Sequence, residues 1–484
     1  MLPVVPAALS VTVLVFLLRM MVHGQPEVVA IRNVTIVDPR SGTVTKNATL
    51  VVGADRVEFA GRSPNAKFST TRAVDGAGLF VLPVLWDMHT HINEDDPWAF
   101  PLLVASGVMG VRDMGATLED VQRWRAADRA GEIVPDLRGS GPILTGRVDD
   151  SDPRVKQVAT PASAVATLRD LFAANVDHVK VHDWLSLDTW RTILKSAQGT
   201  RIPVVGHLPI RSDALEAIDS GQRSIEHFGH AWGGFLLDVS IDEQALKREL
   251  RAFVEQARSP LDLSRFTTRE RWARIVESYS EEKARLLAIR LARKATFVCP
   301  TLYSFGWLAQ AHIGPPFAND SRLQFLPPSR QTMLKKLVTA VDERSEGERG
   351  LQRRVYDTQV RLLTTFAKHG VLLLAGTDYA QYPLLFPGLS LYDELRTLVE
   401  AGLTPLSAIR TATANVGRYL GDDRVGCVAA GCAPNLLLIE GDPLQDIESV
   451  SRVRAVIRRG RYIAGQEREA LLERARRRAE RASH

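Results

Sequence analysis

The chain has 484 residues, of which 45% are hydrophobic and 24% are charged, and its formal net charge is +5. This length allows a large buried core and exceeds the usual size of one compact domain, so we expect one large domain and a smaller one. The basic residues are spread out or gathered at the C-terminal end, and none form a patch interleaved with aromatic residues, which excludes nucleic acid as an expected partner.

The N-terminal segment is different in kind from the rest of the chain. Pro3 to Leu18 is almost unbroken apolar sequence, and a small residue, Gly24, stands at a suitable cleavage position. This is typical of a secretory signal peptide over residues 1–24, and it predicts an exported protein, periplasmic or secreted. No Lys or Arg precedes the apolar run, so a retained membrane anchor over residues 2–22 is the alternative, and only then would the membrane be a partner.

Alternating apolar and polar residues with turn signals between them occupy both ends of the remaining chain. The pattern is clear in "VVAIRNVTIVD" and "ATLVVGADRVEFAGR" near the start and in "NLLLIEGDPL" and "RVRAVIRRGRYI" near the end. It is typical of antiparallel strands. We predict one small β-sandwich built from residues 25–82 and 423–463, followed by a basic, solvated helical tail over residues 464–484.

Residues 83–422 alternate short apolar strands with helical segments, which favours βα units and a parallel sheet. Eight such units close a (β/α)8 TIM barrel, so we predict an α/β fold of this kind. The strand candidates, in chain order, are "FVLPVLWDMH", "VMGVRDMG", "LRGSGPI", "VDHVKVHD", "IPVVGHLP", "RSIEHF", "TFVCPTL" and "VLLLAGTD".

Two connections in this middle region are unusually long and helical in pattern, residues 229–294 and 304–370. They follow the sixth and seventh strands and would rise over the C-terminal mouth of the barrel. A lid that selects substrate and a plain solvated insertion are both consistent with their charge. Near the end of the chain, Cys427 and Cys432 flank "VAAG", where a disulfide is compatible with an oxidising compartment.

The stretch "VLWDMHTHI" ends a predicted buried strand with His89 and His91. Residues two apart in a strand point to the same face, so both imidazoles converge on one spot. Neutral imidazole is the commonest metal ligand, and unpaired ring nitrogens would be costly inside a barrel. Further groups able to bind a metal recur near the ends of other predicted strands, namely Lys180, His207, His227 and Asp378.

In this order and spacing the motifs resemble the amidohydrolase superfamily, and more narrowly its imidazolonepropionase-like and Xaa-Pro dipeptidase-like members. The resemblance runs from about Val28 to Arg461. It is carried by "LPVLWDMHTH", "GVRDMG", "HVKVHD", "VVGHLP", "SIEHF", "FVCPTL", "LLAGTD", "LSLYDEL", "SAIRTATANVGRYLG" and "EGDPLQDI".

The resemblance implies a centre of two divalent metal ions, usually zinc. His89 and His91 would hold the more buried ion together with Asp378, and His207 and His227 would hold the other. Lys180, carboxylated by carbon dioxide, would bridge the two ions through its carbamate oxygens.

The sequence departs from the family pattern in two places. Val84 stands where the family has Gly in the first motif, and Tyr392 stands where relatives often carry His. The second change bears on substrate contacts, so we predict Tyr392 and His182, which shares the face of Lys180, as substrate-binding residues. Arg112 and Glu226 are interpreted as an ion pair inside the barrel.

The implied activity is that of a metal-dependent hydrolase that cleaves the amide bond of a dipeptide or N-acyl amino acid with a metal-bound hydroxide. Asp378 would act as general base and then as general acid. A lactonase or phosphotriesterase on the same site is the alternative, because the ligands do not distinguish amide from ester. A non-catalytic metal-binding protein is a third reading, which the completeness of the ligand set opposes. The sequence is compatible with a homo-oligomer and does not determine the oligomeric state.

Overall fold

The computed structural model of the chain describes residues 27–62, 68–92, 99–147, 152–229, 233–256, 268–310, 320–379 and 385–482. The predicted signal peptide or anchor, residues 1–24, lies outside these residues. Within them, no helix combines the length and the apolar character that crossing a membrane would require.

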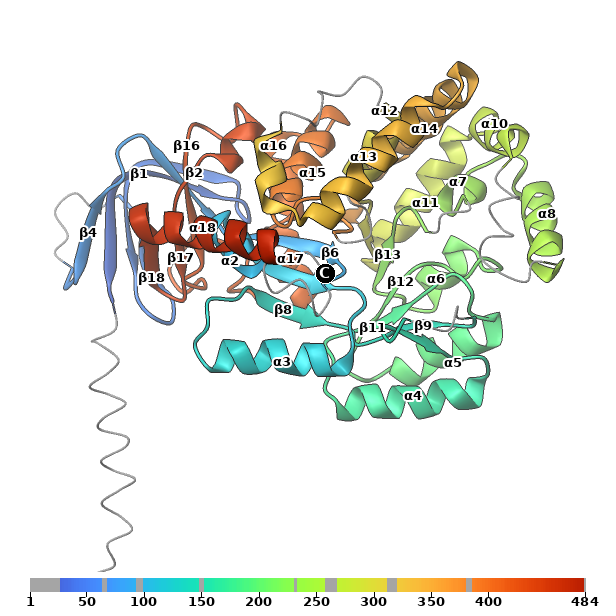
Figure 1. Cartoon of the computed structure of the whole chain (residues 1–484), viewed down its shortest axis with the longest axis horizontal. Helices are drawn as coiled ribbons and strands as arrows, with labels where there is room; N and C mark the ends of the chain where they lie inside the picture. Colours follow the sequence, from blue (N-terminus) through green and yellow to red (C-terminus); the bar gives the residue numbers. More distant parts are fainter. Residues whose placement is uncertain are drawn as a thin grey trace, which may run out of the picture.

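One mainly antiparallel sheet takes its strands from both ends of the chain (Figure 1). Leu437 of β16 pairs with Leu82 of β5, so the two ends meet in the middle of this sheet. The inward side chains, such as Ile31, Leu50 and Leu438, form a separate buried cluster. The strands are β1 (Val29–Asp38), β2 (Thr43–Val52), β3 (Val57–Gly61), β4 (Arg72–Asp75), β5 (Leu79–Pro83), β16 (Leu436–Glu440), β17 (Val453–Arg458) and β18 (Arg461–Ala464).

A disulfide joins Cys427 and Cys432 in the turn that leads back into this sheet, with a Cα–Cα distance of 6.0 Å. Both residues are buried in the same cluster as the sheet, and the backbone N–H of Val57 donates to the Cys432 carbonyl. The bridge therefore closes a short turn against β3. Cys299 is buried and has a free thiol.

The remaining strands are parallel and form the wall of the barrel. Two sheets, β6-β7-β8 and β10-β9-β11-β12-β13-β14-β15, are joined where Asp378 N–H donates to His89 O and where Asp177 N–H donates to Gly139 O. The predicted fold class, a TIM barrel with a small β-domain, is confirmed. The strands are β6 (Leu85–Thr90), β7 (Val108–Asp113), β8 (Asp136–Gly139), β9 (Ile143–Thr145), β10 (Val155–Gln157), β11 (Val179–Val181), β12 (Val204–Gly206), β13 (Ser224–Glu226), β14 (Phe297–Cys299) and β15 (Leu372–Leu373).

Two of the predicted barrel strands are each divided in the structure. The first breaks at Val84, whose N–H donates to Asn435 O, so that β5 stays in the antiparallel sheet and only β6 enters the barrel. The third breaks at Gly141, which adopts a positive φ of 68°, and the second half becomes β9. A glycine tolerates this conformation without steric cost, which makes a turn there inexpensive.

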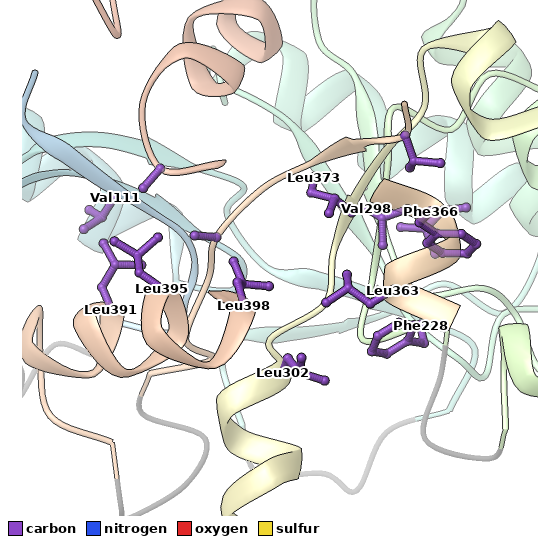
Figure 2. Close-up of a cluster of buried hydrophobic side chains, with 14 of the residues drawn as sticks. Val111, Phe228, Val298, Leu302, Leu363, Phe366, Leu373, Leu391, Leu395 and Leu398 are labelled. Carbon is purple, nitrogen blue, oxygen red and sulfur yellow. The ribbon is translucent and has the colours of Figure 1, made fainter. Parts of the chain in front are cut away.

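Helices cover the outside of the barrel and bury apolar side chains against it. Figure 2 shows Leu391 and Leu395 of α15 beside Val111, with Leu398 farther along the same helix, and Phe366 of α14 beside Val298. The helices of this layer are α2 (Phe100–Ala105), α3 (Leu118–Arg129), α4 (Pro161–Ala173), α5 (Leu187–Ala197), α6 (Ala214–Asp219), α15 (Leu389–Glu400), α16 (Pro405–Thr411) and α17 (Ala414–Leu420), and the short η4 (Ile447–Ser451) follows β16.

The described parts of the two long connections fold into packed helices. In the second, α14 packs against α10, α11 and α12 and buries Leu351, Tyr356 and Leu362 among others. The helices are α7 (Phe235–Asp238), α8 (Glu243–Gln256), α10 (Arg269–Glu277), α11 (Glu281–Lys294), α12 (Leu302–Gln310), η3 (Ser321–Phe325), α13 (Pro328–Asp342) and α14 (Glu346–Lys368).

The basic tail forms one helix, α18 (Gly465–Arg481), which lies across the molecule beside α2 (Figure 1). Leu471, Ala475 and Ala479 are buried on one face, while its arginines mostly face outward. The expected helix is therefore present, but its apolar stripe attaches it to the barrel, so it is not solvated on all sides.

A buried carboxyl group ties α15 to the start of α12. The side chain of Glu394 accepts hydrogen bonds from the backbone N–H groups of Leu302 at 3.1 Å and Tyr303 at 2.7 Å. Burial raises the pKa of Glu394 to about 8, although these two hydrogen bonds lower it. In the unfolded chain the same group would titrate near 4.5.

This difference predicts a pH-dependent contribution to stability. The folded state holds the Glu394 proton between about pH 4.5 and 8 while the unfolded state releases it, so this contribution falls as the pH rises through that window. Between pH 5 and 8, we expect the free energy of unfolding of Glu394→Gln to fall less steeply with pH than that of the unmodified protein. The two slopes should differ by up to about 1.4 kcal/mol per pH unit. Urea unfolding of both proteins across this range measures it. Parallel pH profiles would contradict the raised pKa.

Candidate metal centre

Five barrel strands bring ionisable side chains to one point at their carboxyl ends. His89 is the last residue but one of β6, His91 directly follows that strand, and Lys180 lies inside β11. His207 and His227 come directly after β12 and β13, and Asp378 lies in the segment that follows β15. In a barrel the carboxyl ends of the strands surround one space, and the six predicted groups meet there.

Asp378 lies at the centre of the imidazoles. Its Oδ1 is 3.4 Å from His89 Nε2 and 3.3 Å from His91 Nε2. Its Oδ2 is 4.0 Å from His227 Nε2. Burial alone would raise the pKa of Asp378, but the neighbouring His227, His91 and Lys180 hold this pKa below its usual value.

The imidazole rings form a continuous row across the mouth of the barrel. The ring centroids of His91 and His89 are 5.3 Å apart, those of His89 and His227 are 4.4 Å apart, and those of His227 and His207 are 5.0 Å apart. His182 extends the row, 4.3 Å from His207. Burial lowers the pKa values of all five rings, so they are neutral at pH 7.

Three of these rings are each held by their Nδ1 atom. His89 Nδ1 lies 2.9 Å from Glu226, and His207 Nδ1 lies 2.6 Å from Asp183. Carboxylates accept hydrogen bonds, so in these two rings Nδ1 carries the proton and Nε2 keeps its lone pair. His227 Nδ1 is hydrogen-bonded to Thr301 Oγ1 at 2.7 Å. This arrangement, in which a neighbour sets the tautomer of a ligand imidazole, is common at metal sites.

Glu226 is itself fixed by a buried network. Arg112 donates to both of its carboxylate oxygens, at 3.0 and 2.9 Å, and the Ser224 hydroxyl donates to it at 2.5 Å. Arg112 also donates from Nε to the backbone oxygen of Met88, next to His89. The predicted ion pair inside the barrel is confirmed, and it has a further role because it orients the His89 ring.

Lys180 is almost completely buried, with a relative exposure of 1%. Its Nζ has no hydrogen-bond partner among the described residues, and burial lowers its pKa to about 8. Gly206 makes room for it, because a Cβ there would lie 2.9 Å from Lys180 Cδ and 2.2 Å from the Val181 carbonyl oxygen. A lysine with a lowered pKa is partly neutral, and a neutral amine is the form that can react with carbon dioxide.

These residues fit a divalent cation. Three buried polar atoms in this cluster have no hydrogen-bond partner among the described residues: His89 Nε2, Lys180 Nζ and Asp378 Oδ1. Leaving such atoms unpaired is costly unless something binds them. Neutral imidazole and carboxylate oxygen are zinc ligands, and the reactive atoms of His89, His91 and Asp378 lie within 4.8 Å of one another.

Three residues at this centre adopt a left-handed backbone conformation. His227, Thr301 and Asp378 all have positive φ, at 51°, 47° and 61°. Residues with a Cβ rarely adopt this conformation, and it persists where the surrounding structure imposes it, often at functional sites. His227 and Asp378 carry an imidazole and a carboxylate of the centre, and Thr301 carries the hydroxyl that is hydrogen-bonded to the His227 ring.

Two other groups of potential ligands lie nearby. His89, Glu226 and Cys299 are close together, but Glu226 is already paired with Arg112, and burial raises the pKa of the Cys299 thiol well above its usual value. In the second group, Asp183 holds His207, and His182 stands beside them. We interpret both groups as the surroundings of the main cluster.

The two predicted substrate-binding residues, His182 and Tyr392, lie in different parts of the barrel. His182 is brought to the row of imidazoles, beside His207. Tyr392 is not, because its hydroxyl donates to the backbone oxygen of Ser106. Ser106 precedes β7, so this bond lies at the amino end of a strand, whereas the imidazoles lie at the carboxyl ends. The prediction for Tyr392 is therefore corrected: the residue secures α15 against the end of α2.

Sequence reasoning missed Asp183 and Thr301 as partners of ligand imidazoles. Asp183 stands inside "HVKVHD" and Thr301 inside "FVCPTL", so both belong to motifs that carry the family resemblance. Their pairing with His207 and His227 joins residues 24 and 74 positions apart. Such pairing depends on neighbouring strands, which motif spacing does not show.

Comparison with known proteins agrees with this geometry. Residues 352–463 match the Amidohydrolase family. An ochratoxinase from Aspergillus niger is 24% identical over 443 residues, which cover 86% of this chain and 82% of that protein. Its likeness therefore extends over both the barrel and the flanking sheet.

Solved structures share the fold over nearly the whole chain. A candidate prolidase from Bifidobacterium longum is 22% identical with a TM-score of 0.63, and the alignment covers 93% of this chain and 99% of that one. A bottromycin amidohydrolase is 21% identical with a TM-score of 0.71, covering 94% and 92%. A Xaa-Pro dipeptidase with methionine bound in its active site is 18% identical with a TM-score of 0.61, covering 90% and 100%.

The family match covers the last part of the barrel sequence and the C-terminal strands of the small sheet. The shared fold extends over the whole barrel and the whole small sheet. The His and Asp cluster sits where the barrel strands end. The carboxy-terminal part of the protein therefore matches the Amidohydrolase family, and the chain as a whole shares the fold of the solved amidohydrolase and dipeptidase structures.

Proposed function

We propose that the protein is a metal-dependent hydrolase that cleaves the amide bond of a dipeptide or N-acyl amino acid. The observation that carries this proposal is Asp378, a buried carboxylate of lowered pKa that stands between the Nε2 atoms of His89 and His91. A carboxylate in this position is ionised and can take a proton.

The number of ligands favours two divalent ions, zinc in the first instance. Four ligands complete a tetrahedral zinc site, and six groups converge here, His89, His91, Lys180, His207, His227 and Asp378. An ammonium group on Lys180 would repel a cation, so a carboxylated Lys180 is part of the proposal. Its support is the buried Nζ, which has no hydrogen-bond partner among the described residues, and the lowered pKa of Lys180.

Divalent cations in such a site supply Lewis-acid activation of water and of the scissile carbonyl. The chain supplies the proton transfers. Asp378 would accept the proton from the attacking water and then deliver it to the leaving nitrogen. Glu226, Asp183 and Thr301 keep three of the imidazoles in position, so that Nε2 faces the centre throughout. The neutral form of the rings is preserved by burial.

The choice of substrate rests on similarity to proteins of the same fold. Their names include prolidase, Xaa-Pro dipeptidase and amidohydrolase, and one of them holds an amino acid in its active site. All of these names concern amide bonds or their products. Lactones and phosphotriesters are the alternative substrates, because the same ligands would activate water towards either.

Two measurements on the purified, metal-loaded protein test the proposal. Elemental analysis should find about two zinc-like ions per chain, because six ligand groups exceed the four of a single site. A screen should include Xaa-Pro and other dipeptides, N-acyl amino acids, lactones and a phosphotriester. Turnover of dipeptides or N-acyl amino acids supports amide hydrolysis, whereas turnover of the last two alone would overturn it. One ion or none after reconstitution would overturn the two-ion centre.

A further inference from the structure

A cavity of about 410 Å³ opens beside the metal centre, between α10, α12 and α14. His227 lies at one end of it, and its ring centroid is 6.2 Å from that of Phe305 on α12. Tyr356 of α14 packs against the next residue of α12, since a Cβ at Gly306 would meet its ring at 2.8 Å. The cavity therefore begins at the imidazole row and is built from the two long connections.

The walls of the cavity are aromatic and aliphatic. Phe305, Trp272 and Leu351 contribute to its lining, together with Val355 and Leu236. Apolar walls of this kind favour a substrate group that leaves water on binding. The cavity is also long, because Glu348 and Tyr356 of α14 both line it, and the eight-residue separation of these positions spans about 12 Å of helix at 1.5 Å per residue. It is longer than one proline ring requires.

Two mostly buried residues bring polar atoms to the cavity. Gln359 and Tyr356 line it and have relative exposures of 7% and 8%. An amide and a phenol hydroxyl can both donate and accept hydrogen bonds, so these two residues are suited to a polar group of a ligand. They stand on α14 next to the aromatic walls.

The outer end of the cavity is weakly cationic. Arg269 and Arg344 line it together with Glu348, which gives an excess of one positive charge. Arg269 is exposed and makes no hydrogen bond or ion pair within the described part of the chain. This end therefore favours a neutral or anionic group over an ammonium group of the same size.

We propose that this cavity is the specificity subsite for a bulky aromatic group on one side of the scissile amide. This inference rests on the proposed amide hydrolysis. The enzyme would then prefer N-aroyl or aromatic amino-acid amides to small dipeptides. Phe305, Trp272 and Tyr356 would enclose the ring, and the Arg269 end would disfavour a cationic substituent.

Two substrate series test the subsite, N-acetyl-, N-benzoyl- and N-naphthoyl-L-proline, and N-acetyl-L-alanine, -phenylalanine and -tryptophan. We expect kcat/KM to rise roughly 10- to 100-fold with ring size in at least one series, the gain that burial of a ring provides. Val355→Trp, which fills the cavity, should abolish that rise while the metal content stays unchanged. Asp357→Trp, on the exposed side of the same helix, should retain it.

Other outcomes separate this proposal from the function on which it rests. If no amide is cleaved, the proposed function fails. If amides are cleaved but neither series responds to Val355→Trp, the subsite is overturned. Trp272→Ala, at a half-buried position, is the second variant if Val355→Trp does not fold, and it should reduce the preference for rings.

The charge of the outer end is tested with Arg269→Gln. The unmodified enzyme should prefer N-(4-carboxybenzoyl)-L-proline to its 4-aminomethyl analogue at low salt, and the variant should narrow the ratio at least threefold. An unchanged ratio would remove the charged end from the subsite.

Discussion

Replacing Asp378 by Asn is expected to lower kcat/KM for amide hydrolysis by about 10²- to 10⁴-fold, the usual contribution of a positioned acid–base group. An amide cannot take a proton from water or deliver it to a leaving nitrogen. Its oxygen can still face His89 and His91, which stay in place. We therefore expect the variant to keep its fold and much of its metal, measured by elemental analysis beside steady-state kinetics.

The matched control is Asp55→Asn, an exposed position in the small domain. It makes the same chemical change far from the barrel mouth and should leave kinetics and metal content unaltered. Turnover close to that of the unmodified enzyme in the Asp378 variant would exclude Asp378 as the proton-transfer group. His207→Ala should behave differently from both, because the loss of an imidazole removes metal as well as activity.

Replacing Lys180 by Met should abolish activity without lowering the stability of the metal-free protein. The variant keeps a side chain of similar length but cannot form a carbamate, so we expect metal content below two ions per chain and loss of nearly all hydrolysis. The metal-free variant should unfold at the same temperature as the metal-free parent or higher. Removing a buried Nζ that has no partner among the described residues relieves a penalty of about 1–3 kcal/mol.

Thermal unfolding of both metal-free proteins and elemental analysis measure these two effects. Lys156→Met, at an exposed position of β10, is the control and should alter neither. Full metal content and full activity in the Lys180 variant would show that the carbamate is not needed. Carbon-13 NMR after incubation with labelled carbon dioxide should show the modified lysine directly, and only above the pH at which the amine becomes neutral. With a pKa of about 8 for Lys180, labelling should rise between pH 7 and 9.

The position of the centre was predictable because of how strands order their side chains. His89 and His91 share a face of β6 by the period of two, and the carboxyl ends of parallel strands surround one space. The approach of Asp378 to His89 follows from closing the barrel between β15 and β6, where Gly376 permits contact: a Cβ there would lie 2.7 Å from that of His89.

Predictions failed where one side chain's direction decided the outcome. Tyr392 was expected near the substrate, yet its hydroxyl reaches the Ser106 carbonyl. The position of a residue within a helix does not predict which neighbours it will contact, because the angle between the helix and the barrel is set by packing. The division of the first strand at Val84 was missed for a related reason, since a continuous apolar run does not show where one sheet ends and another begins.

The sequence by itself determined the α/β barrel with its small β-domain, since alternation and strand order are local patterns. It also determined which groups gather at the barrel mouth, because strand ends do so in any barrel. Only the tertiary structure decided what surrounds them. The pairing of Asp183 with His207 and of Thr301 with His227, and the cavity between α10, α12 and α14, join segments far apart in the chain. Their contacts depend on side-chain direction and helix packing, which no local pattern records.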